Sequence, residues 1–187
     1  MSSVDLGSVL LDPDEIDDVL GTSGSELLDE GSAPDDTTEV NPPRCHGVVY
    51  LGGEIEYTST NLTAMRWRII GAADVASVVE LVAQLPSVAK ADEFIGAQTK
   101  AWEGCADEVI TTRDKVGTST TQERVTAVRG GPHTVIASTL PLSSGKACQH
   151  VMQVVSNFVL EVSACGNNVS DQAEAIASKL VDRVRSG

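Results

Sequence analysis

The chain has no lysine or arginine in its first forty positions and no excess of basic residues elsewhere. The 187 residues include 13 lysines and arginines against 27 aspartates and glutamates, for a net charge of -14. Residues 1–40 hold twelve of the acids, so the other 147 residues carry fifteen acids and thirteen bases, or -2. Proteins that neutralise nucleic-acid phosphates need a basic stripe, and anionic membrane surfaces attract polybasic segments. The sequence therefore predicts no nucleic-acid partner and no direct binding to an anionic membrane.

Long apolar runs are also missing. No window reaches the roughly 18 apolar residues of a membrane-spanning helix. The first residues lack the charged and apolar regions of a secretory signal. We therefore expect contact with a membrane only through a tether or anchor outside this chain.

The sequence lacks the motifs that would support catalysis or metal binding. His46, His133 and His150 stand apart from one another, and the cysteines are not grouped at the spacing of zinc ligands. Cys148 and His150 lie two residues apart, and on a helix such side chains do not face each other. We therefore expect His150 at the surface, and we predict no enzymatic activity, no metal and no cofactor.

The composition that is present divides the chain into three segments. A hydrophobic content of 41% over 187 residues is enough for one domain with a substantial core. Residues 1–21 are expected to form a short acidic helix. Residues 22–43 are poor in large apolar side chains and predict a flexible acidic linker or loop. The folded body then spans residues 44–187.

Helices are expected where apolar side chains recur at intervals of three and four residues between capping signals. Asp12, Pro13 and Gly21 supply the cap, the first residue and the stop of the first helix. Ser87 and Ser170 are expected to cap two later helices. The expected helices cover residues 13–20, 75–85, 88–105, 143–156 and 171–185.

Segments rich in β-branched residues lie between these helices. The stretch "ERVTAVRGGPHTVIASTL" alternates on both sides of a turn signal that runs from Arg129 to Pro132, which predicts a hairpin. Further strands are expected at residues 47–53, 62–70 and 158–164. Grouped strands without a regular βαβ rhythm favour a single α+β domain with a mainly antiparallel sheet packed with helices.

Four cysteines, Cys45, Cys105, Cys148 and Cys165, offer a choice between structural and chemical roles. They allow three disulfide pairings, and the sequence alone does not choose among them. Structural disulfides would place the protein in an oxidising compartment.

A ligand site is sought among side chains that a core does not require. The candidates are Tyr50, Tyr57, Arg66, Trp67 and Arg68, which lie on or near the early strands. In a strand, Arg66 and Arg68 share one face and Trp67 takes the other. Two arginines on one sheet face can hold a carboxylate or phosphate group. The alternative is a solvated sheet face with Trp67 buried.

Several stretches follow one another in a combination that is specific. They are "LLDPDEIDDVLG", Cys45, "MRWRII", "LPSVAKADEFIGAQTKAWEGC" and "CQHVMQVVSNFVLEVSACGNNVSDQAEAIASKLVDRV". Together they resemble the PknH-type extracellular sensor domain family, which includes ectodomains of mycobacterial transmembrane Ser/Thr kinases and related envelope lipoproteins. The resemblance covers most of residues 8–185.

The resemblance implies an α+β domain stapled by the disulfides Cys45–Cys105 and Cys148–Cys165, with a solvent-exposed cleft for a small ligand. It also implies a non-enzymatic domain outside the plasma membrane. The expected function is an extracytoplasmic sensor that binds an unknown small molecule or envelope ligand and signals to a kinase. The alternative is a free-standing envelope lipoprotein that acts as a carrier or scaffold.

Overall fold

The fold is built on one antiparallel sheet. The computed structural model describes residues 5–72, 75–143 and 145–187. Within these residues, nine strands lie in the order β1-β3-β4-β9-β8-β7-β6-β5-β2, and all neighbouring pairs are antiparallel. The strands are β1 Glu26–Gly31, β2 Thr38–Asn41, β3 Ala64–Gly71, β4 Val75–Gln84, β5 Val109–Asp114, β6 Thr120–Gly130, β7 Thr134–Pro141, β8 Ala147–Val155 and β9 Phe158–Gly166.

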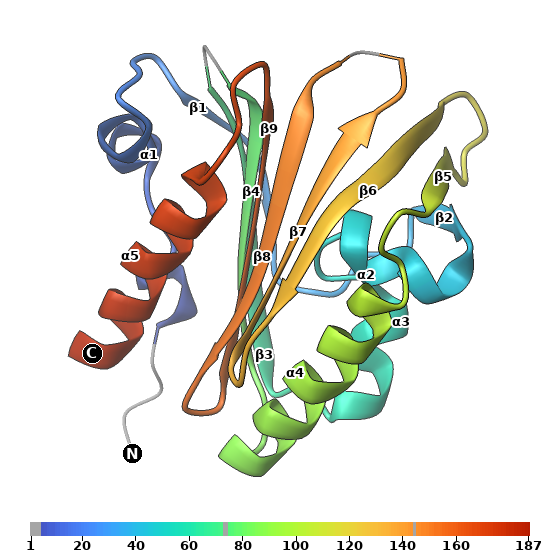
Figure 1. Ribbon diagram of the computed structural model, residues 1–187. Helices are drawn as coiled ribbons and strands as arrows, with labels where there is room; N and C mark the ends of the chain where they lie inside the picture. The colour runs from blue at the N-terminus through green and yellow to red at the C-terminus, as the bar shows by residue number, and fades with distance from the viewer. Residues whose placement is uncertain (1–4, 73–74, 144) are drawn as a thin grey trace.

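Helices cover both faces of the sheet. The α-helices are α1 Pro13–Leu20, α2 His46–Val49, α3 Glu54–Tyr57, α4 Val88–Glu103 and α5 Gln172–Ser186, and the 3-10 helices are η1 Leu6–Ser8, η2 Pro43–Cys45 and η3 Thr58–Thr60. Figure 1 shows α5 and α1 on one side of the sheet, and α4, α2 and α3 on the other. No helix in the described residues is long and apolar enough to span a membrane. The predicted α+β class with a mainly antiparallel sheet is confirmed.

The two faces of the sheet carry separate cores, because successive side chains of a strand point to opposite sides. On the face that we call the closed face, Ile70, Val78 and Leu160 pack with apolar side chains of α5 and η1. On the face that we call the cleft face, Leu81 and Met152 pack with side chains of α4 and of the short helices. Every central strand therefore contributes to both cores.

Local signals located α1 and α4 correctly. Asp12 is the N-cap of α1, its backbone N–H donates to the Glu15 carboxylate at 2.9 Å, and Gly21 ends the helix in the left-handed conformation. The Ser87 hydroxyl caps α4 by accepting a hydrogen bond from the Lys90 backbone N–H at 3.2 Å.

The start of α5 differs from the expected cap. The helix begins at Gln172, and Ser170 lies before it without capping it. The cap comes instead from β8, where the buried Gln149 amide oxygen accepts from the backbone N–H groups of Ala173 at 3.1 Å and Glu174 at 3.3 Å. A residue distant in the sequence thus replaces the local cap.

Two expected helices are strands. Residues 75–85 form β4, and residues 143–156 contribute β8 instead of a helix. Both strands lie inside the sheet and are covered on both faces, so their apolar residues form near-continuous runs that match helical spacing equally well. The valines in both runs favour the extended conformation.

Two other expectations were also wrong. Residues 47–53, expected as a strand, form α2 and the turn that follows it. Residues 22–43, expected as a flexible linker, contain β1 and β2, which lie at the two opposite edges of the sheet. Edge strands can have exposed side chains, as β1 does, and they then lack the apolar alternation that marks a strand in the sequence.

Both disulfides form with the pairing that the resemblance implied. Cys45 bonds to Cys105, and Cys148 bonds to Cys165. The second pair lies directly opposite in the register of β8 and β9, so this disulfide joins two neighbouring strands.

Candidate ligand-binding site

A chain of short helical turns covers part of the cleft face. It runs through η2, α2, α3 and η3. The Cys45–Cys105 disulfide links η2, at its start, to the turn that follows α4. Turns this short cannot cover the sheet as a long helix does, and a cavity remains on either side of them. We call these the polar cavity and the apolar cavity.

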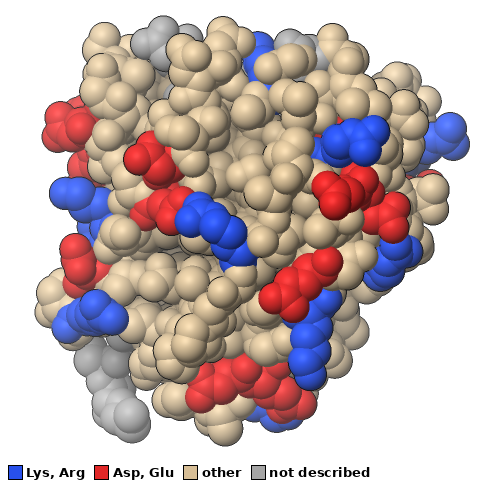
Figure 2. Space-filling model, in the orientation of Figure 1, with Lys and Arg blue, Asp and Glu red and all other residues tan. Residues whose placement is uncertain are grey.

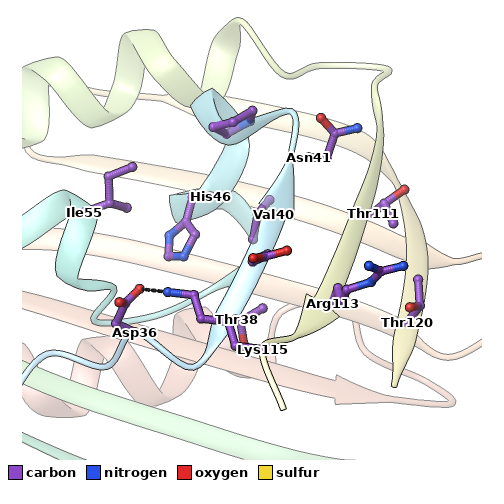
Figure 3. A pocket seen from close by; sticks show the side chains of 12 residues that line it. Asp36, Thr38, Val40, Asn41, His46, Ile55, Thr111, Arg113, Lys115 and Thr120 are labelled. Carbon is purple, nitrogen blue, oxygen red and sulfur yellow. Dashed lines mark hydrogen bonds and ion pairs between the residues drawn. The ribbon is translucent and has the colours of Figure 1, made fainter. Parts of the chain in front are cut away.

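The polar cavity lies between the short helices, the edge strand β2 and its neighbour β5. It has a volume of about 580 Å³. Figure 3 shows its lining, which includes Asp36, His46, Ile55, Arg113, Lys115 and Thr120. Both charged groups and apolar atoms therefore face the same space.

His46 is held in this cavity by a carboxylate. Its side chain is 10% exposed, and its Nδ1 lies 2.9 Å from both carboxylate oxygens of Glu56. A carboxylate only accepts hydrogen bonds, so Nδ1 carries the proton and donates. In the part of the chain that the structure describes, Nε2 has no partner, and Figure 3 shows the ring among the side chains that line the cavity. The ring is thus fixed on one side and open to a ligand on the other.

Two cations from β5 and the turn after it face the same cavity. The Lys115 ammonium pairs with the Asp36 carboxylate. Arg113 lies directly opposite Glu39 in the β2–β5 register, yet its guanidinium makes no hydrogen bond or ion pair with any described residue. A guanidinium offers five donors in a fixed plane, which suits a carboxylate or phosphate ligand.

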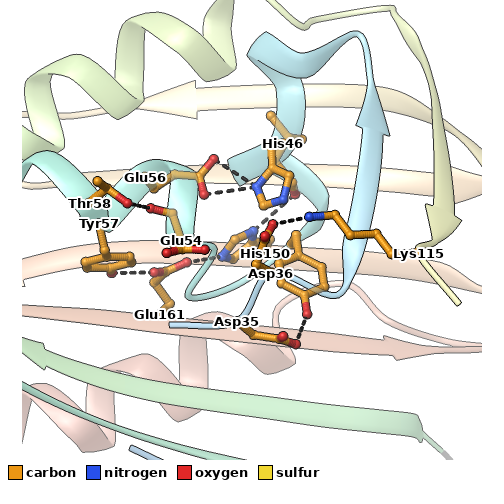
Figure 4. Close-up of polar contacts among 12 residues, drawn as sticks. Asp35, Asp36, His46, Glu54, Glu56, Tyr57, Thr58, Lys115, His150 and Glu161 are labelled. Carbon is orange, nitrogen blue, oxygen red and sulfur yellow. Dashed lines mark hydrogen bonds and ion pairs between the residues drawn. The ribbon is translucent and has the colours of Figure 1, made fainter. Parts of the chain in front are cut away.

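A buried polar network lies beside this cavity on the cleft face (Figure 4). The Tyr57 hydroxyl donates to Glu161 at 2.5 Å, and His150 Nε2 lies 3.1 Å from the other oxygen of the same carboxylate. His150 Nδ1 lies 3.1 Å from the carbonyl oxygen of Val48. Burial and the neighbouring Glu161 charge raise the pKa of Tyr57 well above its usual value.

The Val48 carbonyl oxygen fixes one proton of this network. A carbonyl oxygen only accepts, so His150 donates to Val48 from Nδ1, and its Nε2 shares a hydrogen bond with the Glu161 carboxyl group. The Trp102 ring packs against the imidazole at 4.5 Å between centroids. His150 is 3% exposed, so the expected surface position was wrong. On a strand, His150 and Cys148 do share a face, but the disulfide occupies Cys148.

The apolar cavity lies on the other side of the short helices, against β3, β4 and β9. It has a volume of about 270 Å³ and includes Leu81, Tyr50 and Trp67 in its lining. The Tyr50 hydroxyl donates to Asp35, and burial followed by this contact raises the pKa of Tyr50. Trp67 Nε1 donates to the carbonyl oxygen of Ala33 at 3.0 Å. Both rings are therefore anchored at their polar ends.

The five ligand candidates from the sequence do not converge on one place. Tyr50 and Trp67 line the apolar cavity, and Tyr57 belongs to the buried network. Arg66 and Arg68 lie on the closed face, because they alternate along β3 with the same phase as Ile70, which belongs to the closed-face core. Sequence reasoning missed His46, Arg113 and Lys115, which come together only through the pairing of β2 with β5.

Charges on the surface are mixed. Figure 2 shows acidic and basic side chains next to one another on the face in view, without a continuous basic area. Among the described residues, no group of three or more histidine, cysteine, aspartate or glutamate side chains is placed to hold a metal ion.

An antiparallel domain with two structural disulfides is typical of a protein outside the cytoplasm, because thiols stay reduced inside it. The chain belongs to the PknH-like extracellular domain family, whose model matches residues 2–183. The domain is therefore extracytoplasmic, as predicted.

Named relatives agree with this assignment. The chain is 30% identical to the serine/threonine-protein kinase PknH of Mycobacterium bovis, over 96% of this chain and 30% of that protein. It is also 30% identical to the kinase of the same name from Mycobacterium tuberculosis, over 96% of this chain and 29% of that protein. The chain thus spans about 30% of the length of these curated relatives.

A solved structure supports the fold directly. The chain matches the crystal structure of the extracellular domain of PknH from Mycobacterium tuberculosis with a TM-score of 0.91 and 27% sequence identity. The match covers 100% of this chain and 98% of that chain.

Proposed function

We propose that this extracytoplasmic domain is the ligand-binding part of a sensor, and that the polar cavity takes a small molecule with a carboxylate or phosphate group. The observation that carries the proposal is the position of His46, held by Glu56 with Nε2 open to the cavity, beside Arg113 and Lys115. We propose no catalytic role for the domain.

The choice of an anionic ligand follows from the donors that remain available. Arg113 has no partner among the described residues, and its planar donors match two oxygens of one anionic group. The ammonium of Lys115 is partly exposed, and among the described residues it pairs with the exposed Asp36 alone, an arrangement that a competing anion can replace at little cost. The exposed Ile55 adds an apolar wall for the rest of the ligand.

The kinase names of the relatives support a signalling role. In this proposal, ligand binding at the polar cavity changes the arrangement of the domain and thereby the activity of a kinase region elsewhere in a longer protein. A ligand can shift such an equilibrium only by its difference in affinity for the two states. The cavity is a suitable place for that difference, because β2, β5 and the short helices all line it.

Two matched arginine variants test the site. Inorganic phosphate and citrate are titrated at constant ionic strength into the wild type, Arg113→Gln and Arg66→Gln, and the amide signals are followed by NMR. Both arginines lie on strands, are exposed and have no partner among the described residues, but Arg66 lies on the closed face. We expect saturable shifts near Arg113 that weaken by about tenfold or more in Arg113→Gln, the loss of about one charged hydrogen-bonded contact.

The control decides whether the effect is local. Arg66→Gln should bind as the wild type does. Equal weakening of anion binding in both variants would mean that net charge, and not the position of Arg113, determines the affinity. The absence of saturable shifts for either anion would contradict the proposed ligand class. An unchanged affinity in Arg113→Gln would show that the anion does not bind in the polar cavity.

A further inference from the structure

A glutamate is buried in the centre of the sheet, among apolar side chains of the closed face. Glu80 lies in the middle of β4 on the closed face, between Val78 and Val82, and its exposed fraction is 0%. Among the described residues, neither carboxylate oxygen has a hydrogen-bond partner. Burying an ionised carboxylate in this way costs several kcal/mol, so the group favours its neutral form.

The N-terminal segment shields this glutamate from water. We call residues 5–20, which include η1 and α1, the strap. Its side chains Leu6, Val9, Leu10 and Leu11 are buried in the core of the closed face. The Leu11 backbone lies beside the Glu80 carboxyl and lowers its pKa, although it does not reach hydrogen-bond geometry. The strap therefore lies directly over Glu80.

Two arginines hold the strap in place. Arg68, which faces Glu80 across the β3–β4 register, donates to the Leu11 carbonyl oxygen at 3.1 Å and to Asp12 at 3.0 Å. Arg183 of α5 donates to the carbonyl oxygen of Ser8 at 3.2 Å, to that of Leu10, and to Glu15. In the described structure, both guanidinium groups bind the strap and neither hydrogen-bonds the buried glutamate.

The charges around Glu80 act in opposite directions. Arg68 from β3 and Arg183 from α5 lower the pKa of Glu80, whereas Glu15 from α1 raises it. On the remaining neighbouring strand, β9, the directly opposite residue is the apolar Val162. Burial outweighs the arginines and raises the pKa of Glu80 from 4.5 to about 8. With the strap docked, Glu80 therefore holds a proton at neutral pH.

We propose that Glu80 is a proton-binding site that controls the docking of the strap. With Glu80 protonated, the strap stays docked on the closed face. Loss of the proton leaves a buried charge without a hydrogen bond, and release of the strap lets water reach it. The domain thus has a proton as a second input, at a site that shares no residue with the polar cavity.

The direction of the pH effect follows from the two protonation states. A released strap exposes Glu80, whose pKa then returns toward 4.5, so release gives up one proton between pH 4.5 and about 8. The release equilibrium therefore rises with pH across this window, by up to about tenfold per pH unit. It levels off below and above the window, and acid favours the docked state.

Amide hydrogen exchange of the full chain tests the proposal. Protection factors, corrected for the intrinsic pH dependence of exchange, are compared for a strap peptide and a β8–β9 peptide from about pH 5 to about pH 8. The variants are Glu80→Gln, which mimics the protonated acid, and Glu123→Gln. Glu123 is the matched control, because burial also raises its pKa but its strand places it with Val125 on the cleft face.

We expect strap protection in the wild type and in Glu123→Gln to fall with pH, by up to about tenfold per unit, and to stay level in Glu80→Gln. The β8–β9 peptide should keep its protection throughout. An equal slope in both peptides would mean global unfolding and would overturn strap release. A slope that persists in Glu80→Gln would overturn the role of Glu80.

A second measurement does not depend on a variant folding well. The carboxyl carbon of Glu80 is titrated by NMR in the wild type and identified by its connection to the assigned backbone and side-chain resonances of Glu80. A midpoint near 8 supports the proposal, and a midpoint near the ordinary 4.5 contradicts it.

Discussion

Two buried glutamates on neighbouring strands have opposite surroundings. Glu80 on β4 and Glu161 on β9 are 0% and 1% exposed, and the strands that carry them pair directly. Glu80 faces the strap on the closed face and has no hydrogen-bond partner among the described residues. Glu161 faces the cleft and binds both Tyr57 and His150.

This difference reflects how each face is covered. The closed face is covered by α5 and the strap, whose apolar side chains exclude water. The cleft face is covered by α4 and short helical turns that also supply polar partners, and it carries both disulfides and the apolar cavity. Helical turns this short bury little surface, so the cleft face depends on covalent and polar contacts more than the closed face does.

Breaking a disulfide on the cleft face should give the largest effect. Replacing Cys45 and Cys105 together by alanine opens a loop with a sequence separation of 60. The chain-entropy model gives a loss of about 4.3 kcal/mol in the free energy of unfolding. Denaturant unfolding under non-reducing conditions measures it.

The hairpin disulfide provides the comparison. Opening Cys148–Cys165, with a separation of 17, should cost about 3 kcal/mol. The order of the two losses in unfolding free energy is a sharper test than either value, because both disulfides lie on the same face and the model ranks them by loop length alone. A larger loss from the shorter loop would show that the short helices keep their place without Cys45–Cys105.

Disrupting the Glu161 network should come next. Glu161→Gln replaces the carboxyl group that binds both Tyr57 and His150 in a buried site, and we expect a loss of about 3 kcal/mol in unfolding free energy at neutral pH. Glu80→Gln, on the neighbouring strand, should instead stabilise the protein increasingly with pH, by about 1.4 kcal/mol per unit within its titration window. Equal losses in both variants would contradict the difference between the faces.

The sequence located elements whose signals are local. The Asp12 cap and Gly21 stop define α1, and the Ser87 cap defines α4, because these residues act within one helical turn. It failed at β4 and β8, where burial on both faces makes the apolar run compatible with a helix or a strand. It also missed β1, whose exposed side chains show no alternation, and β2, which has four residues and one buried side chain, Val40.

The candidate site was harder to predict than the fold. Tyr50 and Trp67 were chosen for their chemistry and do lie together at a cavity. Arg68 was chosen for the same reason, but its guanidinium donates a hydrogen bond to Leu11 of the strap and does not line either cavity. His46 and Arg113 are far apart in the sequence, and only the pairing of β2 with β5 brings them to one cavity, so no local pattern marks them.

The smallest of these effects concerns the long-range helix cap on the closed face. Gln149→Ala removes the acceptor for the backbone N–H groups of Ala173 and Glu174, and we expect a loss of about 1 to 2 kcal/mol in unfolding free energy. Gln153→Ala is the control, since Gln153 lies on the same face of the same strand and makes no side-chain hydrogen bond to a described residue. It should cost less than about 0.5 kcal/mol. Equal losses would mean that packing against β8, and not the cap, fixes the start of α5.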